Sequence, residues 1–387
     1  MPFLRHLLAT AILAGLIGTG LWLHESLGRQ ASFLLISGAL FGFVLQRSRF
    51  CFFCMLRDWF EERDPRGVLG ILAALAVGTA GYLVLFGAWV PDPAAGHLPP
   101  RAHIGPASWA VILGGLLFGI GMSLSGSCLS AHLYRLGEGS WISLFALAGA
   151  VGGFIAGFGL WNHLWSFTIA DAQVLWIPEH LGYAGSAALQ LSLLAVLAIW
   201  LLSRLKLAGQ REAETVSPRL LWNRVMVDRW PAWVGGIFVG LIGTAAYLRA
   251  EPLGVTAEFS RHSRELGDRL GLIPERLEGL DRLAGCIVSD TARLIGNNGM
   301  FVIAMVFAAL AAALVAGQFR LQAAGPAKVT SALAGGFLLG LGAMIALGCT
   351  IGTLLSGISA LALSGWLFAL AMVLGVWITL PLRRRLL

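Results

Sequence analysis

The most regular feature of the chain is a series of long apolar runs separated by short polar segments. A helix needs roughly 20 apolar residues to cross a bilayer. Runs of about this length cover residues 6–24, 67–90, 106–127, 141–161, 182–203, 230–249, 299–320, 330–348 and 360–381. A shorter run at 31–46 makes a further span if it extends toward Phe53. The pattern predicts an all-α polytopic membrane protein with about ten spans.

The composition agrees with this interpretation. The 387 residues are 57% hydrophobic and 12% charged, whereas about 25% charged residues is typical of soluble proteins. The net charge of +7 is spread over short clusters between the apolar runs, so we expect no nucleic-acid partner. The partner we expect is the lipid bilayer around the helices. The first run is followed by His24-Glu25-Ser26 instead of a small-residue cleavage site, and we expect it to remain as a span.

The Lys and Arg residues of the short loops predict the orientation of the spans. The segment 204–229 holds six of them and 47–66 holds five, whereas 162–181 holds none. Alternating ten spans then places the N- and C-termini in the cytoplasm. The segment 249–298, with seven Arg and eight acidic residues, lies outside against this rule, but long segments constrain orientation less.

An internal repeat joins the two halves of the chain. Residues 114–133 (GGLLFGIGMSLSGSCLSAHL) align without a gap on residues 335–354 (GGFLLGLGAMIALGCTIGTL), which places Cys128 on Cys349. A weaker similarity pairs Cys54-Met-Leu-Arg-Asp with Cys286-Ile-Val-Ser-Asp. With one extra span between them, the two copies have inverted topology, as in many secondary transporters. The predicted divisions are an N-terminal extra span at 1–30, a first inverted repeat at 31–181, a connecting span and cytoplasmic linker at 182–229, and a second inverted repeat at 230–387.

Each repeated span is followed by a stretch too short to cross a membrane, at 128–140 and 349–359. We interpret these stretches as re-entrant half-helices, which are tolerated where they are buried in protein or line a cavity. The N-terminus of a half-helix presents free N–H groups and the positive end of a dipole, both suited to an anion. Cys128 and Cys349 would then face each other near the centre of the protein. The alternative is that each is simply a small buried apolar side chain.

Other candidate residues lie at the predicted ends of the spans. Cys51 and Cys54 form a C-x-x-C pair, which is typical of a redox pair or half of a metal site, but no second pair completes a zinc site. Arg49, Arg57 and Arg135 either anchor the chain at the cytoplasmic interface or attract anions. His132 is a candidate proton partner for Cys128, and Cys286 is a candidate outer thiol.

No motif indicates catalysis. The sequence has no phosphate-binding G-x-x-x-x-G-K-[ST] loop and no C-x-x-C-H haem motif. It also has no spaced His and carboxylate set of the kind found in metalloenzymes. We therefore expect no cofactor, no resident metal and no catalytic residue, and we do not expect the protein to be an enzyme.

At these motifs the chain resembles the YeeE/YedE family of sulfur-compound membrane transporters. The matching segments include Arg-Ser-Arg-Phe-Cys ending at Cys51, Gly-Ser-Cys ending at Cys128, and Gly-Cys-Thr-Ile-Gly around Cys349. The full set covers residues 43–52, 56–58, 114–121, 126–128, 134–139, 254–261, 348–352 and 356–366. The resemblance implies uptake of thiosulfate, or of a related small sulfur anion, across the bacterial inner membrane.

The resemblance also implies roles for particular residues. Three cysteines that pass the anion along by hydrogen bonds fall on Cys51, Cys128 and Cys349. Cys54 and Cys286 depart from the family pattern and are assigned as accessory thiols.

Alternative functions remain open at this point. One is a membrane sulfurtransferase that forms a persulfide on Cys51 or Cys54 and passes sulfur to a cytoplasmic sulfur-carrier protein. Selenium compounds are an alternative substrate, because selenium-linked relatives share much of the pattern. Permeation of a soft metal ion through the thiols is a third reading, but no Met-rich or His-rich entry tract accompanies it.

Overall fold

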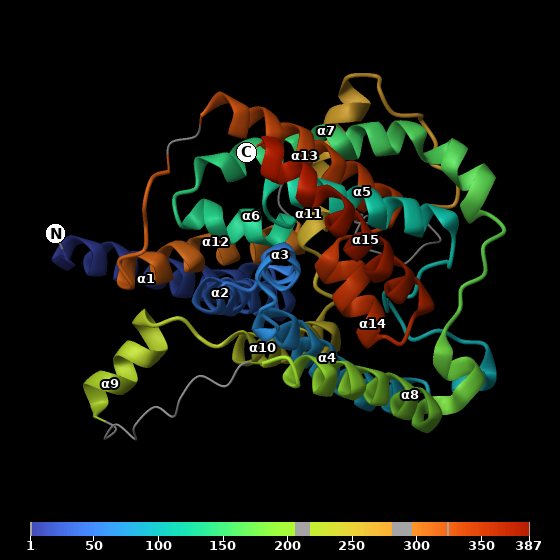
Figure 1. Cartoon of the computed structure of the whole chain (residues 1–387), viewed down its shortest axis with the longest axis horizontal. Helices are drawn as coiled ribbons and strands as arrows, with labels where there is room; N and C mark the ends of the chain where they lie inside the picture. Colours follow the sequence, from blue (N-terminus) through green and yellow to red (C-terminus); the bar gives the residue numbers. More distant parts are fainter. Residues whose placement is uncertain (1, 206–216, 281–295, 323–324, 387) are drawn as a thin grey trace.

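The computed structural model describes residues 2–205, 217–280, 296–322 and 325–386, and these form a bundle of α-helices (Figure 1). The long helices are α1 (Pro2–Ser26), α2 (Arg29–Ser48), α4 (Arg66–Trp89), α5 (Trp109–Ser125), α7 (Trp141–Leu164), α8 (Ile177–Leu202), α10 (Ala232–Arg249), α12 (Asn297–Val315), α13 (Pro326–Ile345) and α15 (Leu363–Leu386). The shorter elements are α3 (Phe52–Glu62), α6 (Leu129–Gly137), α9 (Pro218–Trp222), α11 (Val255–Arg269) and α14 (Gly357–Ser359), with the turns η1 (Pro93–Ala95), η2 (Trp165–Ile169), η3 (Asn223–Val227) and η5 (Thr350–Ser356). Within these ranges β structure is limited to isolated bridges.

The prediction of a polytopic all-α membrane protein is confirmed. Among the described residues, 10 helices are long and apolar enough to cross a membrane. Their ends are set by individual capping residues, which can lie inside the apolar runs. The Ser108 side chain accepts a hydrogen bond from the Val111 N–H and starts α5, and Gly126, at φ 86°, ends it. The helix expected from 182 begins earlier, at Ile177, and contains a non-helical residue at Gly182.

The shorter run at 31–46 does not continue unbroken toward Phe53. It forms α2, which ends at Ser48, and the chain then turns at Arg49 with φ 49°. Cys51 is extended, and α3 begins at the next residue. The break holds the Cys51 backbone outside any helix.

The long helices pack in pairs through glycines that leave no space for a side chain. A methyl group on Gly336 or Gly340 of α13 would overlap the backbone of α7, and one on Gly119 would overlap α15. The pairs are α13 with α7, α5 with α15, α12 with α2, α10 with α4, and α5 with α13. Such close backbone approach is typical of membrane helices.

The crossing of α5 and α13 is reciprocal with respect to the sequence repeat. Gly114 lies against Gly342, and Gly335 lies against Gly121. Gly114 corresponds to Gly335 in the repeat alignment, and Gly121 corresponds to Gly342. Equivalent positions of the two copies therefore make the same contact, each with the other copy.

Four short segments, one of them made of two elements, follow long helices after a break. These are α3 after α2, α6 after α5, α11 after α10, and η5 with α14 after α13. Figure 1 shows α3, α6 and α11 in the middle of the bundle, between the long helices α7 and α13 on one side and α4 and α8 on the other. The weaker similarity at 286–290 lies outside the described residues. The described helix that follows α10, as α3 follows α2, begins at Val255.

Candidate functional site

Three cysteines occupy equivalent places in the fold, each as the residue that precedes a short element. Cys51 precedes α3, Cys128 precedes α6, and Cys349 precedes η5. All three have extended backbones and are at most 1% exposed. Because each lies at a break, the backbone N–H groups of the next turn are free to point at its sulfur.

The thiols lie next to one another. Cys51 is within side-chain hydrogen-bonding reach of Cys128 and of Cys54, and Cys349 lies close enough to Cys128 to interact with it electrostatically. All four are free thiols. The N–H groups of Ala131 and Phe52 approach the Cys128 side chain. The structure thus brings together Cys51, Cys54 and Cys128, with Cys349 nearby, although they are far apart in sequence.

A second set of N–H groups surrounds Cys349. Those of Ile351 and Gly352 approach its sulfur, as does the side chain of Thr256 from α11. The loop before α5 covers this region, where the buried His103 Nε2 lies 3.1 Å from the Thr353 hydroxyl. Burial lowers the pKa of His103 to about 4, so its ring is neutral at pH 7.

The opposite end of the row of thiols is positively charged. The Arg135 guanidinium donates a hydrogen bond to the Cys54 sulfur at 3.0 Å, and its other nitrogen lies 3.4 Å from the Gly126 carbonyl. The Arg383 guanidinium lies over the Phe53 ring, 5.0 Å from its centroid. Arg57 is paired with Asp58 at 2.7 Å. Arg135 and Arg57, both predicted, therefore lie near the thiols, and Arg383 joins them.

The other predicted residues lie elsewhere or face different partners. Arg49 is exposed and lies near Glu138, a carboxyl group whose pKa is raised mainly by burial. His132 is buried, but its Nδ1 faces the Ser143 hydroxyl at 3.3 Å. Cys286 lies outside the described residues. Within the described ranges, no cluster of three His, Cys, Asp or Glu side chains forms a metal site.

Sequence reasoning missed Thr256 and Arg383. The signal for Thr256 was the order of elements: it lies two residues after Gly254, which precedes α11 as Cys51 precedes α3. The signal for Arg383 was weaker, because an arginine near the end of the last span is equally typical of an interface anchor.

In the described part of the chain, ten apolar helices and a buried row of thiols define a multi-pass membrane protein with polar groups inside its bundle. A family described as "Sulphur transport" matches residues 47–378. The chain belongs to this family. It is 30% identical over 356 residues to the thiosulfate transporter TsuA of Escherichia coli (strain K12), covering 89% of this chain and 92% of that protein.

Two further relatives were found. The thiosulfate transporter TsuA of Spirochaeta thermophila is 28% identical over 350 residues, covering 89% of this chain and 96% of that protein. The probable transporter YedE of Salmonella typhimurium is 32% identical over 154 residues, covering 39% of this chain and 37% of that protein.

Proposed function

We propose that the protein is a bacterial inner-membrane transporter that takes up thiosulfate, or a related small sulfur anion, through a path lined by cysteines. The adjacent thiols of Cys349, Cys128, Cys51 and Cys54 carry this proposal. The family description supports sulfur-compound transport, and the names of two relatives support thiosulfate. The protein acts in this proposal by binding and releasing its substrate, without catalysis.

The proposal includes two halves of inverted topology. They cover 31–181 and 230–387, with an extra span at 1–30 and a connecting span and linker at 182–229. The reciprocal glycine contacts between α5 and α13 support this division. The distribution of Lys and Arg supports cytoplasmic N- and C-termini. In this arrangement α6 and η5–α14 are half-helices that enter from opposite sides of the membrane.

The thiols suit a path through which an anion must keep moving. A thiol is a weak donor with a polarizable sulfur, so each contact holds the anion only loosely. Several weak sites in a row favour entry without trapping. Removing a dianion from water is costly, and the N–H groups that approach Cys128 and Cys349 offset part of that cost.

The arginines complete the path at the end we assign to the cytoplasm. Arg135 holds a positive charge against Cys54, and Arg383 lies over the Phe53 ring next to it. Arg57 and Arg49 are placed nearer the surface, where they raise the local concentration of anions.

The test is uptake of radiolabelled thiosulfate by proteoliposomes that contain the purified protein. Wild-type protein is expected to accumulate thiosulfate, and Cys128→Ser and Cys349→Ser are each expected to lose uptake while still folding. Cys54→Ser leaves the other three thiols in place and is expected to retain measurable uptake. Full uptake by both Cys128→Ser and Cys349→Ser would exclude the cysteine path.

A second candidate is a membrane sulfurtransferase, favoured by the contact between Arg135 and Cys54. A neighbouring guanidinium offsets part of the cost of a buried thiolate, the nucleophilic form of cysteine. The thiolate would attack the outer sulfur of thiosulfate, gain that sulfur as a persulfide and release sulfite, and a cytoplasmic carrier would then accept the sulfur. Mass spectrometry after incubation with thiosulfate distinguishes the two functions, because transport leaves Cys54 without the mass of an added sulfur atom.

A further inference from the structure

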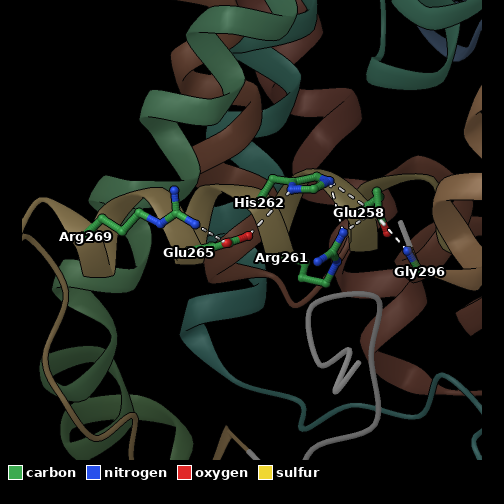
Figure 2. A network of polar contacts seen from close by, with 6 residues as sticks. All are labelled: Glu258, Arg261, His262, Glu265, Arg269 and Gly296. Carbon is green, nitrogen blue, oxygen red and sulfur yellow. Dashed lines mark hydrogen bonds and ion pairs between the residues drawn. The ribbon is translucent and has the colours of Figure 1, made fainter. Parts of the chain in front are cut away.

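Helix α11 presents hydroxyl groups on one side and charges on the other. Thr256, Ser260 and Ser263 recur at the spacing of one helix face, and all three are fully buried. The charged side chains lie on the opposite face, where they bind one another (Figure 2). In that network Glu258 accepts hydrogen bonds from Arg261 and from the Gly296 N–H, His262 lies beside it, and Arg269 pairs with Glu265.

The charged side chains of α11 bind one another, whereas the Thr256 hydroxyl needs another explanation. The helix packs against α7, α12, α6 and η5, so its hydroxyl face is turned toward the protein interior. Thr256 is the member of the face that reaches Cys349.

The Thr256 hydroxyl forms no well-aligned hydrogen bond with any described residue. It cannot bond to a carbonyl one turn earlier in its own helix, because α11 begins only one residue before it. The hydroxyl of Thr350, next to Cys349 in the chain, is also fully buried and without a partner among the described residues. A buried polar group without a partner is costly, so two beside one thiol point to a missing ligand.

We propose that Thr256 and Cys349 form a subsite that binds the oxygen atoms of the transported anion. This inference rests on the proposed function and adds a residue to it. The Thr256 hydroxyl donates to an anion oxygen, and Thr350 and the N–H groups of Ile351 and Gly352 supply further donors close by.

The two halves of the path then differ in chemistry. Cys51 and Cys128 place two sulfurs together, whereas the other half places a hydroxyl beside Cys349. A thiosulfate ion has an outer sulfur at one end and oxygens at the other. The hydroxyl subsite binds the oxygen end, and the pair of thiols binds the sulfur end.

The test compares thiosulfate uptake at a series of concentrations in proteoliposomes containing the full-length protein. Thr256→Val keeps the shape of the side chain and removes the hydroxyl, so the half-saturation concentration is expected to rise about tenfold or more, as for loss of a hydrogen bond to a charged group. Thr256→Ser keeps the hydroxyl and is expected to restore a value close to that of the wild type. Thr379→Val is the matched control, because Thr379 is buried but bonds to the Gly375 carbonyl of its own helix at 2.8 Å.

The outcomes separate this inference from the proposed function. A purely structural Thr256 would change the yield of folded protein and leave the half-saturation concentration of that protein unchanged, which would overturn the assignment. If the valine variant does not fold, Thr256→Ala takes its place with the same expectation. Absence of uptake by the wild type would refute the proposed function, whereas normal uptake by Thr256→Val together with loss in Cys128→Ser would refute the subsite alone.

Discussion

Arg135 reaches into the protein and meets a sulfur atom, at 3.0 Å from Cys54. Among the described residues, no carboxylate lies within ion-pair distance of its guanidinium. A buried charge is costly unless it is paired. Arg57 differs, because Asp58 neutralises it and its side chain is 34% exposed. In the proposed path, an anion at the thiols therefore neutralises Arg135 more than it neutralises Arg57, which already has a carboxylate partner.

Replacing Arg135 by glutamine is expected to lower the rate of thiosulfate uptake about tenfold or more, because a hydrogen bond from a charged group is lost. Arg57→Gln is expected to have a smaller effect. Arg135→Lys is expected to restore uptake only in part, since an ammonium lacks the planar fork of donors. The three variants are compared by their initial rates of uptake into proteoliposomes at low thiosulfate concentration. An unchanged rate in Arg135→Gln would show that Arg135 is not part of the path.

The residues of the candidate site were predictable to different degrees. Cys128 and Cys349 could be singled out because the repeat places them in register. Thr256 had a weaker signal, the order of elements, because its half of the repeat has no cysteine to align with Cys51. Its role depends on a contact between α11 and η5, and a contact between distant segments leaves no trace in the local pattern.

Single residues with a left-handed backbone end the long helices and so fix where the short elements α3, α6 and η5 begin. The backbone is left-handed at Arg49, Gly126 and Leu347, shortly before Cys51, Cys128 and Cys349 respectively. Only glycine adopts this conformation readily, and for other residues it costs on the order of 1 kcal/mol. The apolar runs predicted the long helices and a break between residues 348 and 349, whereas Arg49 carries no turn signal, so the sequence could not locate the break before Cys51.

The close contacts at the glycines of the long helices predict that a side chain at these positions destabilises the protein. Gly340→Val is expected to destabilise the protein, because any side chain on this residue of α13 would overlap the Ala150 backbone of α7. Overpacking of this kind costs about 1–3 kcal/mol or more. Gly87→Val is the matched control, since Gly87 has no other atom within 4 Å of a Cβ. Thermal melting in detergent measures the difference, and equal melting temperatures would contradict the close contact.

At the scale of the whole molecule, the two long helices α1 and α8 are the least buried in the protein. Only 17% of the apolar window of α1 and 22% of that of α8 is buried in the protein, compared with 61% for α12. These helices are the N-terminal span and the connecting span of the proposed division. The remaining eight candidate spans pair through the crossings already described.

The proposed orientation has a direct test. Ala95→Cys lies in the exposed loop between α4 and α5, which the proposal places outside the cell. Ser217→Cys lies just before α9, in the segment assigned to the cytoplasm. A membrane-impermeant thiol reagent is expected to label Ala95→Cys in intact spheroplasts and Ser217→Cys only after permeabilisation, with the unsubstituted protein as the background. The opposite pattern would reverse the direction of the path.

The glycine-mediated contacts between long helices have a mechanical consequence. Helices whose backbones touch cannot slide or roll past one another without separating first, so α5, α7, α13 and α15 behave as a stiff frame. Among the short elements, Gly137 of α6 also lies against the backbone of α12, and Gly67 of α4 lies against Met55 of α3, whereas the glycine contacts described for the long helices do not extend to α11 and η5. In the proposed transporter, the displacement that lets an anion pass is therefore to be sought first in α11 and η5, inside a frame that stays still.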